Sequence, residues 1–81
     1  MITGAQVRAA KALLDWSGAR LAAEAQVAIS TIRRVEACNG LLETASIKVL
    51  YALKTALEGG GVEFIGTPED RPGVRLNINK K

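Results

Sequence analysis

The stretch that most constrains what this chain can fold into is residues 17–36, SGARLAAEAQVAISTIRRVE. Its apolar residues recur at the three- and four-residue spacing of helices, so we expect two short helices joined by a tight turn. Small alanines on the inner side allow two such helices to cross closely at a steep angle. The residues expected to face inward are Leu21, Ala22, Ala25, Val27, Ile32 and Val35.

A further helix is predicted before this pair, from about Gly4 to Leu14. Thr3 followed by Gln6 is a capping-box pattern, in which each side chain bonds to the backbone N–H of the other residue. The apolar side of this helix ends next to Trp16, which we interpret as a core anchor. The residues predicted to form that side are Val7, Ala10, Leu13 and Leu14.

Another helix is predicted after the pair, capped by Thr44 or Ser46 and ending at about Glu58. Its apolar residues recur at helical spacing and are expected to close the underside of the helical bundle. These residues are Ile47, Leu50, Leu53, Ala56 and Leu57.

Beyond the glycines at 59–61 the pattern changes to short β-type runs, VEFI at 62–65 and VRLNI at 74–78. The segment between them, GTPEDRPG, has a loop composition, so we expect a loose hairpin. Because an isolated two-stranded hairpin is only marginally stable, this one must pack on the helices or pair with another chain's strands, which would make a dimer. The fold class is therefore mostly α, with four helices over residues 1–58 and a short β-hairpin over residues 59–81.

Composition argues against an enzyme. The 81 residues contain no histidine and one cysteine, Cys38, so neither a zinc site nor a Ser/His/Asp or Cys/His catalytic set can be assembled. We expect no metal and no cofactor, and we interpret Cys38 as a small buried apolar residue.

Arg8 and Lys11 interrupt the first apolar residues and no apolar run is long enough to cross a membrane, so we expect a cytoplasmic protein with no membrane partner. The net charge of +3 suits a polyanion partner without requiring one.

The run LLDWSGARLAAEAQVAISTIRRVEA, residues 13–37, resembles the helix-turn-helix domain of the XRE/Cro family, whose common pattern is LLGWSQEELAERAGVSxxTIRRxE. The ending GVEFI…GVRLN is similar to that of small stand-alone bacterial regulators. This resemblance implies a lambda-repressor-like helix-turn-helix domain. It also implies a sequence-specific DNA-binding transcriptional regulator, such as a repressor, that acts as a homodimer on operator DNA.

Carried over residue by residue, the resemblance makes residues 28–37 the recognition helix. Ala28, Ile29, Ser30 and Arg34 then occupy positions that face base edges, and Arg33 would reach a phosphate or a flanking base. A guanidinium can donate two hydrogen bonds to guanine, worth about 1–3 kcal/mol against a wrong base, so Arg34 is the expected base reader.

Two other parts of the family pattern fall on the preceding helices. Ser17 and Gly18 begin the helix before the recognition helix, and the amides there are expected to point at a phosphate. Lys11 and Glu36 match a basic residue and an acid that pair in the family and orient the recognition helix. From the sequence alone, the alternative that both are merely solvated stays open.

Several residues depart from the family pattern. Gly18 replaces a glutamine, Gln26 replaces the turn glycine, Ala28 replaces a capping residue and Ile29 replaces a frequent polar reader. We expect strain or a different turn conformation at Gln26, because a glycine normally takes the left-handed position there. We also expect a weakly held helix start at Ala28, which has no side-chain acceptor.

These departures leave two hypotheses. The first is a dimeric DNA-binding regulator, favoured by Arg33, Arg34 and the positive balance. The second is an antiactivator, in which the same scaffold binds a transcription activator protein through the patch around Ile29. We place DNA first. A third interpretation, an antitoxin-like module, ranks lower because no neutralising tail is visible.

Overall fold

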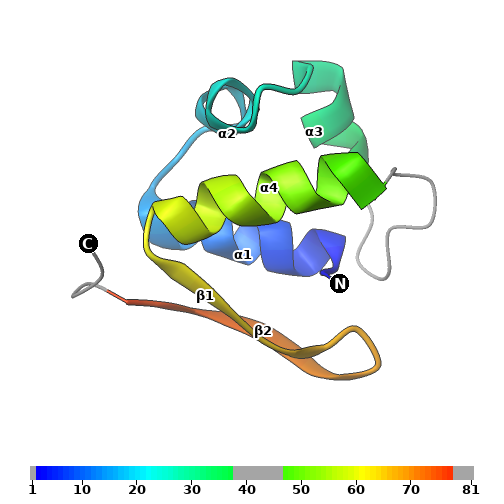
Figure 1. Ribbon diagram of the computed structural model, residues 1–81, viewed down its shortest axis with the longest axis vertical. Coiled ribbons are helices and arrows are strands. Elements are labelled where there is room, and N and C mark those ends of the chain that lie inside the picture. The colour runs from blue at the N-terminus through cyan, green and yellow to red at the C-terminus, as the bar shows by residue number, and fades with distance from the viewer. Residues whose placement is uncertain (1, 38–46, 78–81) are drawn as a thin grey trace.

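The computed structural model describes residues 2–37 and 47–77 (Figure 1). Within these residues the chain forms four helices and one two-stranded antiparallel sheet, which confirms the predicted mostly helical fold. In Figure 1, α1 and α4 lie side by side across the middle, with α2 and α3 on one side and the hairpin on the other. The elements are α1 (Gly4–Leu14), α2 (Gly18–Ala25), α3 (Ile29–Glu36), α4 (Ile47–Gly59), β1 (Val62–Thr67) and β2 (Asp70–Leu76).

The first two helices begin at the caps that the sequence predicts. The Thr3 hydroxyl accepts a hydrogen bond from the Gln6 amide at 3.1 Å, and the Thr3 amide donates to Gln6 Oε1 at 2.8 Å. This is the reciprocal capping box. The Ser17 hydroxyl caps α2 by accepting from the Arg20 amide at 3.0 Å.

The turn between α2 and α3 shows both expected departures. Gln26 adopts the left-handed conformation at φ 60°, where a residue with a Cβ pays about 1–2 kcal/mol. Ala28 is extended and makes no side-chain cap hydrogen bond. Its carbonyl oxygen still accepts from the amides of Thr31 and Ile32, at 3.0 and 3.3 Å, so the backbone alone holds the first turn of α3.

The core lies between the helices and is closed by the start of the hairpin. Of the six residues predicted to face inward from the central pair of helices, four are buried, and Ala25 and Val27 are partly buried against them. Trp16 packs at the edge of the core, where Gly60 passes close to its ring. A Cβ at Gly60 would lie 2.8 Å from Leu14 Cδ1 and 3.0 Å from Trp16 Cζ2. The buried apolar residues are Ile2, Val7, Ala10, Leu21, Ala22, Ile32, Val35, Leu50, Leu53, Leu57 and Val62.

Two residues predicted to be in the core are exposed. Leu13 is 42% exposed and Ile47 is 74% exposed. Successive helical residues are about 100° apart, which places Leu13 about 120° around α1 from Val7. By the same geometry, Ile47 lies well to one side of the line formed by Leu50, Leu53 and Leu57 on α4. The apolar character of a residue alone therefore did not show whether it lies on the buried side of its helix or beside that side, in contact with solvent.

The hairpin is longer and tighter than predicted. Its strands pair from Val62 opposite Leu76 to Thr67 opposite Asp70, so the predicted eight-residue loop over residues 66–73 is wrong. A register shift lies between Ile65 and Thr67, where Gly66 has a φ of 74°. Glycine commonly marks such irregularities within a strand, so the loop-like composition here belongs to a bulged hairpin.

The hairpin packs on the helices of its own chain. Gln6 on α1 is 4% exposed, and its Nε2 donates to the carbonyl oxygens of Gly73 at 2.9 Å and Ile65 at 3.3 Å. Phe64 and Val74 pack against the core from the same side. Of the two ways to stabilise the hairpin that the sequence left open, the structure shows packing on the helices. The predictions for Cys38 and for a cap at Thr44 or Ser46 lie outside the described residues.

Candidate functional site

The outer face of α3 carries the polar residues predicted to contact a partner. Ile32 and Val35 are buried, whereas Ser30, Arg33 and Arg34 are exposed. The two arginines follow Ser30 by three and four positions, so all three side chains share one face of the helix. The prediction that this segment is helical and exposed is confirmed.

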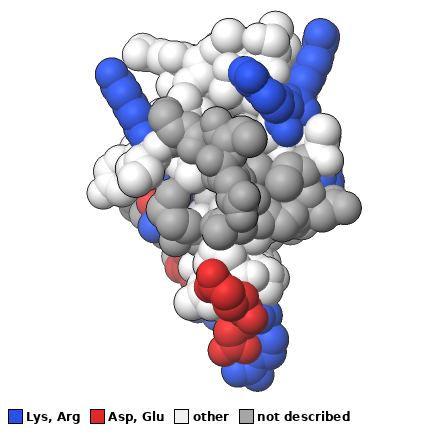
Figure 2. Space-filling view, turned by 90° about the vertical axis from the view of Figure 1, so that its right-hand side faces the viewer, with Lys and Arg blue, Asp and Glu red and all other residues white. Residues whose placement is uncertain are grey.

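This face has an unbalanced positive charge. Among residues 2–37 and 47–77, no carboxylate forms an ion pair with Arg33 or Arg34. The acids of α2 and α3 are each paired with another cation, Glu24 with Arg20 and Glu36 with Lys11, both at 2.9 Å. Figure 2 shows Lys and Arg side chains projecting at the end of the molecule where α2 and α3 lie, whereas acidic and basic side chains lie together at the opposite end. The α3 end therefore presents cations to a partner.

The start of α2 lies against the start of α3. A Cβ built on Gly18 would be 3.8 Å from Ile29 Cδ1 and 3.7 Å from Ile32 Cγ2. Ser17 is exposed, and its hydroxyl satisfies one of the amides at the start of α2, whose first N–H groups have no acceptor within the helix. The structure thus brings Ser17 and Gly18 together with the first turn of α3, as the sequence predicts.

A small apolar patch adjoins the charged face. We define it as Gly18, Ala19, Ala28 and Ile29, of which Ile29 is the largest and is 38% exposed. Its Cδ1 lies 3.8 Å from the position that a Cβ on Gly18 would occupy, and the Lys11 ammonium lies 3.9 Å from the same position. The candidate site therefore combines two guanidinium groups and a hydroxyl with an apolar edge.

Two basic residues of α1 hold the far end of α3. The Lys11 ammonium lies 2.9 Å from Glu36 Oε1, with the two side chains 21% and 19% exposed, which confirms the predicted pair. The Arg8 guanidinium donates to the backbone carbonyl oxygen of Glu36. The other carboxylate oxygen of Glu36, Oε2, is buried and has no hydrogen-bond partner in the part of the chain that the structure describes. Sequence reasoning missed Arg8, although its spacing of three residues from Lys11 places both on one side of α1.

No other chemistry is apparent in the described residues. Residues 2–37 and 47–77 contain no histidine or cysteine, and their aspartate and glutamate side chains form no cluster that could hold a metal ion. None of the described helices has the length and apolar character needed to cross a membrane. In comparisons with known proteins, the chain matches no family model and no curated protein.

Proposed function

We propose that this protein is a sequence-specific DNA-binding transcriptional regulator with a lambda-repressor-like helix-turn-helix, in which α3 is the recognition helix. The observation that carries the proposal is the outer face of α3, where Ser30, Arg33 and Arg34 are exposed and neither arginine has a carboxylate partner among the described residues. Phosphates attract such unpaired cations, and base edges accept from them.

Each side chain has a defined role in this proposal. Arg34 donates two hydrogen bonds to the O6 and N7 atoms of a guanine, and Ser30 bonds a neighbouring base or phosphate. Arg33 reaches a phosphate, as do the first amides of α2 after Ser17. The helix itself is about 12 Å long, close to the width of the major groove.

The regulator acts as a dimer in this proposal. A palindromic operator presents two equal half-sites about 34–36 Å apart, one in each of two successive major grooves. Each subunit would place one α3 in one groove. The contacts of Arg8 and Lys11 with Glu36 would fix the angle between α3 and α1. They would thereby set the orientation of α3 in the major groove.

The experiment is a fluorescence anisotropy titration with duplexes from the region flanking the protein's own gene and with scrambled duplexes of equal length. Arg34→Ala should reduce the preference for the specific duplex by about fivefold to 150-fold, as expected for a lost contact worth about 1–3 kcal/mol. The matched control is Arg71→Ala, which removes the same charge from the hairpin, where Arg71 is 90% exposed. It should leave the preference unchanged.

Salt dependence provides a second test of the same proposal. The logarithm of the affinity should fall linearly with the logarithm of salt concentration, by about 0.9 for each phosphate contacted. Arg33→Ala should reduce the magnitude of this slope by about one. Absence of binding at micromolar protein in low salt, on every duplex tested, would contradict DNA binding.

The second candidate function is an antiactivator that binds a transcription activator protein, and the apolar patch favours it. The patch residues Gly18, Ala19, Ala28 and Ile29 have no polar side-chain groups of the kind with which a DNA-reading surface contacts bases and phosphates. In that case Ile29→Asp should abolish the complex with the activator, because it places a charge in an apolar interface. Arg34→Ala should then be tolerated, and salt should change the affinity little.

A further inference from the structure

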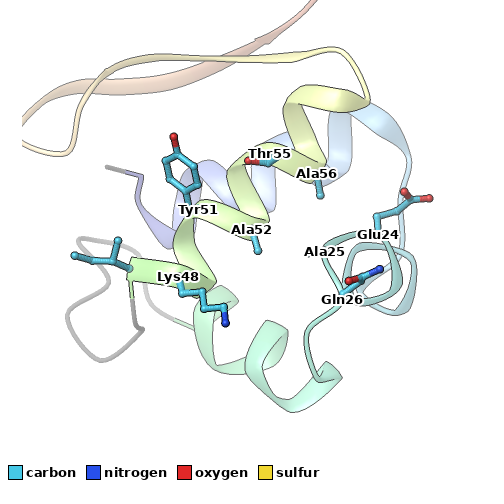
Figure 3. A pocket seen from close by; sticks show the side chains of 9 residues that line it. Glu24, Ala25, Gln26, Lys48, Tyr51, Ala52, Thr55 and Ala56 are labelled. Carbon is cyan, nitrogen blue, oxygen red and sulfur yellow. The ribbon is translucent and has the colours of Figure 1, made fainter.

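An apolar groove runs between the end of α2 and α4, on a surface separate from the outer face of α3 (Figure 3). Its volume is about 690 Å³. Alanines line it on both helices, Ala25 on α2 and Ala52 and Ala56 on α4. Because alanine side chains are short, they leave the space that the groove occupies.

Two large side chains line the same groove and remain exposed. Ile47 is 74% exposed and Tyr51 is 70% exposed, and they stand one turn apart on α4. This surface therefore carries a groove that is lined by small residues. It also carries large exposed side chains that would fill a groove of that kind. A surface that holds both halves of a complementary contact can pair with a copy of itself about a two-fold axis.

We propose that a second copy of this chain occupies the groove, with the two α4 helices packed antiparallel about a two-fold axis near residues 51 and 52. In this register each bulky or long side chain of one α4 faces a smaller one of the other, which allows the two surfaces to interdigitate. The facing pairs are Ile47 with Ala56, Lys48 with Thr55, and Tyr51 with Ala52, and each pair occurs twice.

The charges at the two ends of the groove agree with this arrangement. Lys48 lines one end and forms no ion pair with a carboxylate among the described residues. Glu24 lies at the other end, where it lines the groove together with Thr55 and Ala56. Its Oε2 pairs with Arg20 of the same chain at 2.9 Å, but the Glu24 side chain is 44% exposed, so a second cation can still approach the carboxylate. Since Lys48 of one copy faces Thr55 of the other, the two-fold axis brings Lys48 close to Glu24 of the second copy, twice. An apolar helix from another protein, without such charges, would leave Lys48 and Glu24 at the two ends of the groove without partners across the interface. The charges therefore favour a second copy of this chain as the occupant.

This dimer does not depend on DNA binding. It would supply the two-fold symmetry that the proposed regulator needs, but its interface lies on α4 and α2 and its test contains no DNA. Failure of the dimer and failure of DNA binding are therefore separate results.

The test is analytical ultracentrifugation of the full chain without DNA, from about 1 μM to 1 mM, a range that covers a small helix-pair interface. The wild-type protein should dimerise within this range. Ala52→Glu places a charge opposite Tyr51 of the second copy and should raise the dissociation constant by at least about tenfold. The matched control is Ala9→Glu on the exposed side of α1, which should leave the constant unchanged. Circular dichroism should show that both variants keep their helices.

Charge reversal tests the register. Lys48→Glu and Glu24→Lys should each weaken the dimer, because each places like charges opposite one another twice. The double variant should recover the dimer, because it restores opposite charges across the two-fold axis. A chain that stays monomeric up to 1 mM, a dimer unaffected by Ala52→Glu, or a double variant no tighter than the singles would overturn the proposal.

Discussion

Replacing Gln6 by methionine should destabilise the protein and loosen its hairpin. The Gln6 carboxamide accepts from the Thr3 amide at 2.8 Å and donates to the carbonyl oxygens of Gly73 and Ile65 at 2.9 and 3.3 Å. Gln6→Met keeps the side-chain length but leaves these buried groups without a partner, at about 1 kcal/mol or more for each bond. We expect a loss of about 2–4 kcal/mol from a total that, for a domain of this size, is roughly 4–12 kcal/mol.

The loss should appear in urea unfolding followed by circular dichroism, with an unchanged slope. Hydrogen exchange should also accelerate at residues 62–76, because the hairpin loses its polar contact with α1. Gln26→Met is the matched control: the same change at an exposed residue should cost less than about 0.5 kcal/mol. If Gln6→Met costs no more than this control, the carboxamide does not hold the hairpin.

Gln6→Glu separates the donor from the acceptor at this position. The carboxylate can still accept from the Thr3 amide, but it faces two carbonyl oxygens to which it can donate nothing. We expect the variant to be at least as unstable as Gln6→Met at neutral pH. Its deficit relative to the wild type, measured at the same pH, should shrink as the pH falls, because protonation restores one donor. A deficit independent of pH would contradict the assignment of the donors.

Three further changes test the supports of the fold by urea unfolding. Lys11→Met should cost about 1–3 kcal/mol because it strands the Glu36 carboxylate, whereas Lys54→Met, at an exposed pair with Glu58, should cost under about 0.5 kcal/mol. Equal losses of stability in Lys11→Met and Lys54→Met would refute a special role for the pair of Lys11 and Glu36. Gly60→Ala should cost about 1–3 kcal/mol by crowding Trp16, while Gly59→Ala, with open space around it, should be neutral or stabilising. Gln26→Gly should stabilise by about 0.5–1 kcal/mol by relieving the left-handed residue, and a loss would show that the glutamine side chain contributes more than this strain.

The local features of the fold were predictable because their causes lie within a few residues. The Thr3 and Gln6 capping box, the Ser17 cap and the uncapped start at Ala28 each depend on atoms no more than one helical turn apart. The exposure of Ser30, Arg33 and Arg34 followed from their spacing relative to Ile32 and Val35. For the same reason, the helix boundaries within the described residues agree with the prediction to within about one residue.

The features that were not predictable depend on partners far along the chain. Nothing within one turn of Gln6 indicates that its amide reaches a strand at Gly73. The carbonyl oxygen that binds Arg8 belongs to the backbone of Glu36 and has no signature in the sequence. The exposure of Ile47 was missed because periodicity identifies an apolar side but not how far a neighbouring helix extends over it. The groove beside it therefore had no signal in the sequence.

The candidate site separates residues that hold α3 from residues that can contact a partner. An eight-residue helix is too short to be stable alone, so α3 depends on the burial of Ile32 and Val35 and on the two α1 side chains at its end. Arg33 and Arg34 contribute to none of these supports among the described residues. If the protein binds DNA as proposed, their substitution should therefore change binding without changing stability, whereas Lys11→Met should change both, because it shifts the surface that the arginines share. That difference in response would separate the residues that contact DNA from the residues that hold α3 in place.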